Sequence, residues 1–428
     1  MTPASADTLP KLLAANAAAH GSEIAFREKR LGIWHRITWE ECETRTAALA
    51  LGLVSLGIGA GDVVALIGDN RPNWVMGEIA AHAVGARSLG LYRDALEEEI
   101  ANLLEQSGAR LVFAEDEEQV DKLLAVAERL PRLRVIVYFD PRGMRKYSDA
   151  RLMPATTLVA RGEGQRTADP QHYATLVATT RGDEVAILCT TSGTTARPKL
   201  AMLTAGAMLR HCAAYLKADP KGPRDDYVSV LPLPWIMEQI YVLGWGLLAR
   251  MTVNFVEEPA TMMADFREIG PSFVLFAPRV WEGIAADVRS RMMESSPLKQ
   301  RLFALGMRLG LRALDRGRRS VLADLLLFRA LRDRLGFSRL RSAATGGAAM
   351  GPDTFRFFLA MGVPLRQLYG QTELLGAYTL QRPGDIDVNS VGLPFDASIE
   401  VRIAAPDANG VGEIITRHQN MYAGYHGQ

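Results

Sequence analysis

Residues 190–199 read TTSGTTARPK, a run of small and hydroxyl-bearing side chains that ends in a lysine, Lys199. The run follows the apolar stretch 185–189, which we expect to be a buried strand, and it precedes a helix that Thr204 would cap. Small residues let backbone N–H groups approach an anion closely, hydroxyls add donors, and lysine supplies a point charge. The G-x-x-x-x-G-K-[ST] spacing of the Walker loop is absent. The run predicts a phosphate-binding loop of another kind, and a surface turn rich in Ser and Thr is the alternative.

The sequence around this loop alternates between short apolar runs and helix-like segments. This alternation predicts strands joined by helices, and hence a parallel sheet covered on both faces. The segment 140–184 is rich in Gly, Arg and Asp, and we interpret it as a loop-rich boundary, after which a second α/β unit begins at Val185. The predicted strands are 63–67, 87–91, 111–114, 135–138, 185–189, 227–231, 253–256 and 273–276, and the predicted helices are 70–83, 96–106, 117–129 and 297–335.

The pattern changes after Gly370, where short β-like runs occur at 399–403 and 412–415. We therefore predict an α/β protein with two stacked α/β subdomains, whose sheets are mainly parallel, and a small β-rich subdomain of distorted-barrel type. The predicted boundaries are 1–183 for the first α/β subdomain, 184–368 for the second, which holds the phosphate-binding loop and the long helices, and 369–428 for the β-rich part.

The bulk composition narrows the class of protein. Charged residues make up 23% of the 428 residues and apolar residues 48%, which is the mix of a globular protein that dissolves in water. The net charge of +1 gives no support to a nucleic-acid partner. Cys42, Cys189 and Cys212 lack metal-like or disulfide-like spacing, and no apolar run reaches the ~18–20 residues that span a bilayer. Because residues 1–13 also lack the apolar run of a signal peptide, we expect a cytoplasmic protein.

The stretch 190–199 resembles the phosphate-binding signature T-S-G-T-T-G-x-P-K-G of the adenylate-forming superfamily, which includes acyl-CoA synthetases, luciferases and the adenylation domains of peptide synthetases. Ala196 and Leu200 stand where the family has Gly, and Ala205 stands where a His is common. Other family landmarks occur in the family's order. They are TGGAA at 345–349, YGQTE at 369–373, VGLP at 391–394, GEI at 412–414, and the segment 421–425, which ends in Gly424-Tyr425.

The resemblance implies that ATP and Mg²⁺ bind around these landmarks. It implies that Lys199, Thr372 and Glu373 are catalytic, with Thr372 at the α-phosphate and Glu373 holding Mg²⁺ together with Thr191. Few protein oxygens, completed by phosphates and waters, suit that metal. Tyr369 would pack on adenine, although each of these residues taken alone also fits a plain structural role. The implied nucleotide contacts are Thr191, Ser192, Gly193, Thr194, Thr195, Gly346, Gly347, Ala348, Tyr369, Gly370, Gln371 and Thr372.

Two segments are similar to the long-chain fatty acyl-CoA synthetases. They are 255–282, which contains Arg279, and the helical stretch 297–337. The run LPLPWIME at 231–238 matches the acyl-pocket region, but Trp235 stands where a His is common. A tryptophan there would wall off or gate an apolar tunnel, and a buried core tryptophan is the alternative. The resemblance implies a medium- or long-chain fatty acid, or a related hydrophobic carboxylate, with Trp235 and Arg279 on the substrate side.

The segment 297–341 raises the question of a membrane partner. From Lys299 to Arg341 there are twelve Lys or Arg and three Asp, with Leu and Phe between them. A basic amphipathic helix can lie on anionic lipid, so one interpretation is a peripheral contact with the inner face of the membrane. The other interpretation is a solvated basic face on a core helix.

The family continues beyond the matched region, with a T-G-D segment that holds the ribose, a hinge and a C-terminal lid domain that carries a catalytic lysine. These features are not found after Gly424-Tyr425 in this sequence. We therefore expect a piece of a longer enzyme that activates carboxylates poorly alone and needs its C-terminal domain for thioester formation with CoA. Two alternatives stay open, an acyl-AMP ligase that feeds a carrier protein, and a nucleotide- or acyl-binding homologue without catalysis.

Overall fold

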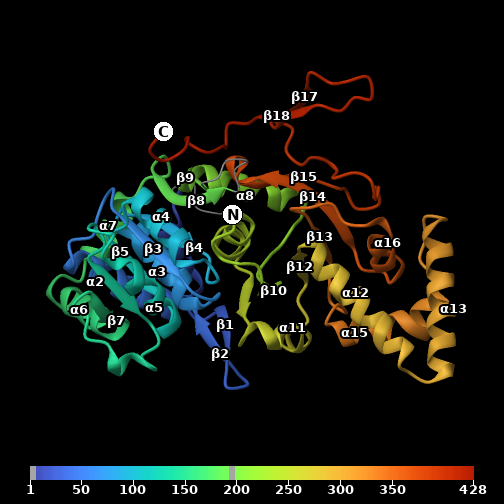
Figure 1. The fold of residues 1–428 in the computed structure, drawn as a ribbon, viewed down its shortest axis with the longest axis horizontal. Coiled ribbons are helices and arrows are strands. Elements are labelled where there is room, and N and C mark those ends of the chain that lie inside the picture. The colour runs from blue at the N-terminus through green and yellow to red at the C-terminus, as the bar shows by residue number, and fades with distance from the viewer. Residues whose placement is uncertain (1–5, 192–197) are drawn as a thin grey trace.

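The alternating segments that surround the predicted loop form one sheet (Figure 1). The structure, a computed structural model, describes residues 6–191 and 198–428. The strand order of this first sheet is β7-β6-β5-β3-β4-β8-β9, and all neighbours run parallel except β8 and β9. Its strands are β3 (Val63–Ile67), β4 (Arg87–Leu91), β5 (Leu111–Ala114), β6 (Val135–Tyr138), β7 (Leu152–Pro154), β8 (Val185–Thr191) and β9 (Lys199–Thr204).

Helices cover both faces of the first sheet. Alternate residues of β3 enter two different apolar cores, Val64 and Leu66 on one side and Ala65 and Ile67 on the other, so every residue of the strand is buried. The predicted strands and helices between 63 and 138 are confirmed to within two residues. The helices are α1 (Leu9–His20), α2 (Trp39–Ser55), α3 (Pro72–Ala83), α4 (Glu97–Ser107), α5 (Glu117–Ala127), η1 (Met144–Lys146), α6 (Ala155–Ala168) and α7 (His172–Thr179).

The prediction of a loop-rich boundary at 140–184 is wrong, because this segment contains α6 and α7. One of the glycines of this segment, Gly162, serves helix packing instead. A Cβ on Gly162 would lie 1.9 Å from the Ala48 carbonyl oxygen of α2, and a Cβ on Gly52 would lie 2.5 Å from the Leu158 carbonyl oxygen of α6. The two glycines therefore let α2 and α6 approach each other closely.

The strand that begins at Val185 was predicted to start a second α/β unit. This prediction is wrong, because the strand belongs to the first sheet. Strand β8 pairs in parallel with β4, with Ser88 opposite Ile187, and so completes the first sheet. In exchange, β1 (Ile24–Arg30) and β2 (Ile33–Thr38) join the second sheet, although they come first in the chain. The sheets thus interlace, and the division at 183/184 and 368/369 stays a prediction.

The second sheet has the strand order β16-β15-β14-β13-β12-β10-β11-β1-β2. The run from β14 to β1 is parallel, and antiparallel pairs close both edges. Strands predicted at 227–231, 253–256 and 273–276 are confirmed as β10, β11 and β12. The remaining strands of this sheet are β10 (Asp226–Ser229), β11 (Thr252–Phe255), β12 (Phe273–Phe276), β13 (Ser342–Thr345), β14 (Leu365–Gln371), β15 (Gly376–Leu380) and β16 (Leu393–Pro394).

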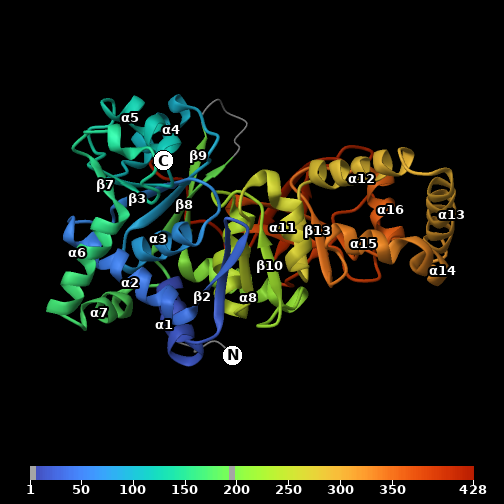
Figure 2. The same cartoon turned by 90° about the horizontal axis from the view of Figure 1, so that it is seen from below.

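Helices and short turns complete the second half of the chain. The long helices predicted at 297–335 are confirmed as α13, followed by the shorter pieces α14, η4 and α15, which lie at one end of the molecule (Figure 2). The elements are α8 (Ala205–Ala218), α9 (Ile236–Glu238), η2 (Gln239–Trp245), α10 (Gly246–Ala249), η3 (Pro259–Thr261), α11 (Met262–Ile269), α12 (Pro278–Met293), α13 (Pro297–Leu314), α14 (Val321–Ala323), η4 (Asp324–Phe328), α15 (Arg329–Leu335), α16 (Pro352–Ala360) and η5 (Thr372–Leu374).

A small antiparallel pair, β17 (Glu400–Ala404) with β18 (Glu413–Arg417), matches the β-like runs expected after Gly370. The predicted α/β class is therefore confirmed, with two mixed, mostly parallel sheets and a small antiparallel sheet. One apolar core reaches from β3 through α3 and η2 to β10 and β12, and it joins the two large sheets. Within residues 6–191 and 198–428, no helix has the length and apolar character needed to cross a bilayer.

Candidate functional site

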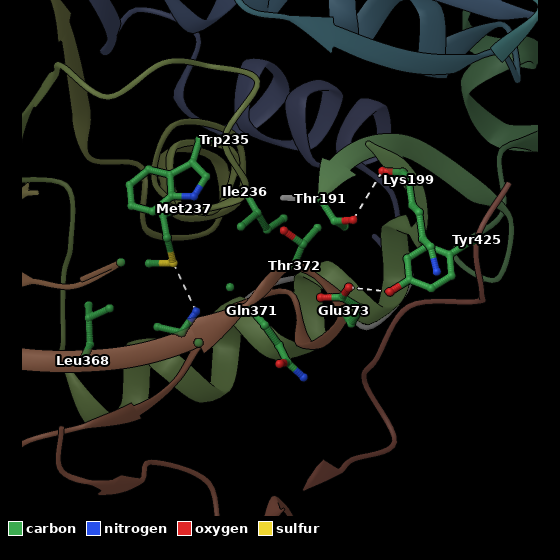
Figure 3. A pocket seen from close by; sticks show the side chains of 14 residues that line it. Thr191, Lys199, Trp235, Ile236, Met237, Leu368, Gln371, Thr372, Glu373 and Tyr425 are labelled. Carbon is green, nitrogen blue, oxygen red and sulfur yellow. Dashed lines mark hydrogen bonds between the residues drawn. The ribbon is translucent and has the colours of Figure 1, made fainter. Parts of the chain in front are cut away.

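A pocket of about 420 Å³ lies between elements of the two large sheets (Figure 3). Its walls come from β8 and β9 of the first sheet, from β14, η5, β15 and the turn after β13 on the side of the second sheet, and from the segment before η2. Polar and charged side chains gather at one end of the view and apolar ones at the other. The lining residues are Thr191, Lys199, Trp235, Ile236, Met237, Gly347, Leu368, Gly370, Gln371, Thr372, Glu373, Gly376, Ala377 and Tyr425.

The hairpin of β8 and β9 supplies two of the predicted residues. Thr191 is the last residue of β8 and Lys199 the first of β9, and they stand directly opposite each other in the ladder. The Thr191 hydroxyl donates a long hydrogen bond of 3.5 Å to the Lys199 carbonyl oxygen. The predicted phosphate contacts Ser192, Gly193, Thr194 and Thr195 lie outside the described residues. The described part of the hairpin thus brings the Lys199 ammonium and the Thr191 hydroxyl to the pocket.

A tight turn between β14 and β15 carries Thr372 and Glu373. Its backbone needs special residues, since Leu375 has φ +62° and Gly376 has φ +90°. A leucine in the left-handed region costs roughly 1–2 kcal/mol, which the surrounding ladder must offset. A Cβ on Gly370 would lie 2.0 Å from the Gly376 carbonyl oxygen, so only glycine allows the two strands to approach this closely. The turn thereby holds Thr372 and Glu373 at the pocket.

Tyr425 joins the charged end of the pocket. Its hydroxyl donates a hydrogen bond of 2.6 Å to Glu373 Oε1, and its ring lies under the Lys199 ammonium, with Nζ 4.8 Å from the ring centroid. The hydrogen bond to Glu373 raises the pKa of the Tyr425 hydroxyl, because the bond stabilises the protonated form. One aromatic side chain therefore contacts both charged residues of the pocket.

The other end of the pocket is apolar. Trp235, Ile236 and Met237 come from the segment before η2, and Leu368 and Ala377 come from β14 and β15. The Met237 sulfur accepts a hydrogen bond from the Ala377 backbone N–H at 3.1 Å, which links these two walls. This composition suits a hydrophobic group bound beside the charged end.

A buried polar network holds the segment that carries Trp235. The Asn70 amide donates to Ser229 Oγ (2.7 Å) and to the Leu231 carbonyl oxygen (2.6 Å), and its oxygen accepts from the Leu233 N–H (3.1 Å). Asn70 follows β3, so these bonds tie the first sheet to a loop that follows β10. The position of this loop at the pocket wall therefore depends on how the two large sheets pack against each other.

The carboxyl group of Glu238 completes this network. Its two oxygens accept hydrogen bonds of 2.5 Å from Ser229 Oγ and from the Tyr227 hydroxyl. The side chain is fully buried, and burial raises the pKa of Glu238 to about 8, because ionisation is disfavoured away from water. The group is mostly protonated at neutral pH, and in that form its O–H donates one of these two bonds, which the hydroxyl partner accepts.

Some predicted site residues lie elsewhere. Gly347 lines the pocket, whereas Gly346 is buried behind it, with Leu368 Cδ1 2.4 Å from where a Cβ would stand, and Ala348 is exposed outside the lining. Tyr369 packs edge-on against Tyr378, with 5.5 Å between ring centroids. Arg279 is exposed near the start of α12 and does not line the pocket. Its predicted role on the substrate side therefore has no geometric support here.

The structure adds six lining residues that received no site role from the sequence. Ile236 and Met237 belong to the quoted run 231–238, and Tyr425 belongs to a quoted landmark, so their motif membership was the available signal. The others, Leu368, Gly376 and Ala377, are placed by the pairing of β14 with β15. Such a pairing between two strands cannot be predicted from the sequence of either strand alone.

The donor set of the pocket fits a magnesium ion. Glu373 and Thr191 both line it and offer a carboxylate and a hydroxyl oxygen. In the described part of the chain, no cluster of three or more His, Cys, Asp or Glu residues forms a metal cage. Magnesium is commonly held by one or two protein oxygens and completed by substrate phosphates and water, so a sparse oxygen set is what it requires.

Comparisons with known proteins agree with this geometry. The family described as AMP-binding enzyme matches residues 13–426. The long-chain-fatty-acid–CoA ligase ACSBG2 of Xenopus laevis is 25% identical over 434 residues, which cover 98% of this chain and 58% of that protein. The long-chain-fatty-acid–CoA ligase FadD15 of Mycobacterium bovis is 27% identical over 408 residues, which cover 92% of this chain and 64% of that protein. The chain thus spans about three-fifths of the length of these curated relatives.

Among solved structures, the A domain of carboxylic acid reductase from Segniliparus rugosus, in complex with AMP and a co-purified carboxylic acid, has the same fold. The TM-score is 0.73 at 19% identity, and the match covers 98% of this chain and 69% of that one. The fold match and the family match over nearly the whole chain confirm the resemblance drawn from the motifs. The chain belongs to the family of AMP-binding enzymes, within the adenylate-forming superfamily.

Proposed function

We propose that this protein activates a carboxylic acid with ATP, forming an acyl-adenylate and releasing pyrophosphate. One observation carries the proposal. A single pocket combines the Lys199 ammonium, the Glu373 carboxylate and the hydroxyls of Thr191, Thr372 and Tyr425 at one end with an apolar wall at the other. Such a pocket suits a substrate that is anionic at one end and hydrophobic at the other. The A domain that shares this fold holds AMP and a carboxylic acid, which supports the same pairing here.

The reaction joins two anions, so the pocket must offset their repulsion. A carboxylate oxygen of the acid attacks the α-phosphorus of ATP, a new P–O bond forms, and the bond to the oxygen bridging the α- and β-phosphorus breaks. Lys199 would offset charge on the phosphates, and the Thr372 hydroxyl would donate to an α-phosphate oxygen. Glu373, with Thr191, would hold Mg²⁺, which when bound supplies positive charge to the phosphates.

The proposed acid is a medium- or long-chain fatty acid. The relatives named above are long-chain-fatty-acid–CoA ligases, and Trp235, Ile236, Met237 and Leu368 give this pocket an apolar wall. The volume of about 420 Å³ lies in the lower half of the ~300–1,000 Å³ typical for drug-sized ligands. An adenylate with a long acyl chain needs more room, so we expect the half-buried Trp235 ring to move when it binds.

Acyl-sulfamoyl adenosine mimics with two, eight and sixteen carbons test this function by titration calorimetry. We expect affinity to rise with acyl length, by up to about fourfold per methylene group that becomes buried. A Trp235→Ala variant should gain affinity for the sixteen-carbon mimic relative to the two-carbon one. An affinity that does not change with acyl length would refute the proposal of a fatty-acid substrate. The absence of binding by all three mimics would refute the proposal of an adenylate site.

Two further choices concern the rest of the reaction. In a longer protein with a lid domain, CoA would accept the acyl group and release AMP. An acyl-AMP ligase that feeds a carrier protein and a binding homologue without catalysis remain the alternatives. Release of pyrophosphate in the presence of ATP, Mg²⁺ and a fatty acid separates an active adenylate former from the homologue without catalysis.

We also propose that the helical end of the molecule contacts an anionic lipid surface, where a fatty acid would partition. On α13, Leu298 and Leu305 are exposed and seven residues apart, so they share a face with Arg301 and Arg308. On α14 and η4, Val321, Leu322, Leu325 and Leu326 are exposed as well. Exposed apolar side chains beside arginines match the apolar and anionic parts of such a surface.

A further inference from the structure

The contact of Tyr425 with two charged residues is fixed by backbone pairing of the segment 422–426. The Met202 N–H donates to the Gly424 carbonyl oxygen (2.9 Å), the Ala423 N–H donates to the Met202 carbonyl oxygen (2.8 Å), and the His426 N–H donates to the Leu200 carbonyl oxygen (2.8 Å). The segment therefore lies along the free edge of β9, with Tyr425 opposite Ala201 in antiparallel register.

This register decides which face Tyr425 occupies. Side chains alternate along a strand, so Ala201 and Lys199 share one face of β9, while Leu200 and Met202 face the apolar core on the other. Tyr425, opposite Ala201, falls on the face of Lys199, and a slip of one residue would move it to the opposite face. Gly424 precedes it with φ +114°, a conformation that side-chain-bearing residues rarely adopt.

A second bond ties the same segment to the turn that carries Glu373. The Tyr422 N–H donates to the Glu373 carbonyl oxygen at 2.8 Å, and the Tyr422 and Tyr425 rings pack edge to face with 5.0 Å between centroids. The segment 422–426 thus bridges β9 of the first sheet and η5, next to the second sheet. Both the backbone and the side chain of Glu373 are held from this one segment.

We propose that Tyr425 is a positioning residue, which presents Glu373 and Lys199 together to a magnesium-bound nucleotide. The inference rests on the proposed adenylate-forming function and assigns the Tyr425 hydroxyl a part in it. The 2.6 Å bond holds Oε1, whereas Oε2 accepts no hydrogen bond from the described residues and stays available to a metal ion. The ring face below Nζ keeps the Lys199 ammonium at the pocket without neutralising it.

The alternative arrangement predicts the opposite effect, which makes the proposal testable. If the hydroxyl merely occupied Glu373, its removal would free the carboxylate and strengthen metal binding. If the hydroxyl aims the carboxylate, its removal lets Glu373 rotate, and metal binding weakens. The deciding quantity is the gain in nucleotide affinity on adding Mg²⁺, measured as the ratio of ATP dissociation constants in EDTA and in Mg²⁺.

The experiment measures this gain by calorimetry, first for the unmodified protein and three single variants. Tyr425→Phe keeps the ring over Lys199 and loses the hydroxyl, so we expect the gain to fall by more than about tenfold, as for the loss of a hydrogen bond to a charged group, with affinity in EDTA unchanged. Tyr425→Leu also loses the cation–π contact, so in this variant affinity in EDTA should fall as well, by ~2–5-fold. Tyr147→Phe is the matched control, since it removes a tyrosine hydroxyl that donates to Glu117 and Asp121 far from the pocket.

A double variant guards against a merely structural effect. Glu373→Gln should abolish the gain, and adding Tyr425→Phe to it should cause no further change in that ratio. A gain in Tyr425→Phe that equals or exceeds that of the unmodified protein overturns the positioning role alone. An unmodified protein that binds no ATP overturns the proposed function and, with it, this inference.

Discussion

The buried carboxyl group of Glu238 should make stability fall as pH rises. Its pKa is raised from the ordinary value of 4.5 to about 8, so between these pH values the folded protein keeps a proton that the unfolded chain has lost. The free energy of unfolding therefore decreases with rising pH in this window. Glu238→Gln removes the titration. Its amide fits the same partners, because the Ser229 and Tyr227 hydroxyls can each donate or accept.

The expected size follows from linkage. Integrating between pH 7 and pH 8 for a group with these two pKa values gives a loss of about 1 kcal/mol from Glu238 alone, so the unmodified protein should lose that much more stability than the variant. The window above pH 7 is chosen for a reason. Burial lowers the pKa values of His82 and His211 to about 4. Their titration therefore changes the free energy of unfolding mainly below pH 7, where it makes stability rise with pH. Burial also raises the pKa of Glu78, so this group makes stability fall with rising pH in the unmodified protein and in Glu238→Gln alike.

Urea unfolding at pH 7.0, 7.5 and 8.0, followed by tryptophan fluorescence, measures the difference. The exposed Glu163 on α6 provides a control, Glu163→Gln, which should leave the pH dependence as it is. If the unmodified protein and Glu238→Gln lose stability in parallel from pH 7 to pH 8, Glu238 ionises normally in the fold, and the account of the Asn70 and Glu238 network is refuted.

Two further predictions concern packing and lipid contact. Gly162→Ala should destabilise the protein by ~1–3 kcal/mol in urea unfolding, because its Cβ meets the Ala48 carbonyl oxygen, while Gly164→Ala on the same helix has open space and should stabilise slightly; equal effects would contradict the close approach of α2 and α6. The protein should co-sediment at physiological salt with vesicles that contain phosphatidylglycerol and not with pure phosphatidylcholine, and Leu325→Asp should weaken this binding; a protein wholly in the supernatant rules the contact out.

The strands near the first sheet's centre could be predicted because burial on both faces leaves continuous apolar runs. Val63–Ile67 and Leu111–Ala114 are read directly from such runs. The sheet to which a strand belongs could not be predicted in this way. Val185 begins an apolar run like the others, and only the pairing of β8 with β4 places it in the first sheet.

Glycine shows the same limit at shorter range. Gly162 and Gly52 have no local signal that separates a turn from a helix contact, since what each touches lies about 110 residues away in sequence. Gly370 has a motif around it and lines the pocket, while its contact with a nucleotide stays a prediction. A motif is defined by residues adjacent in sequence, whereas the role of a packed glycine depends on residues distant in sequence.

The site shows how far motifs reach. Thr191 and Lys199 lie in one motif and Thr372 and Glu373 in another, and the pocket brings both pairs together as the resemblance implied. Arg279 was included because its segment is similar to that of a subfamily, yet it lies on the exposed start of α12. Tyr425 was only a landmark, because its contacts depend on pairing along the edge of β9.

The interlaced sheets have a consequence for how the protein is made. Strand β1 pairs with β11, with Phe26 opposite Val253, so 226 residues must be synthesised between the two partners. On a ribosome adding ~5–20 residues per second, the β1–β2 hairpin waits on the order of ten seconds or more with one edge unpaired. An exposed strand edge is a template for wrong pairing, so a nascent chain of this fold should depend on chaperones until β11 emerges.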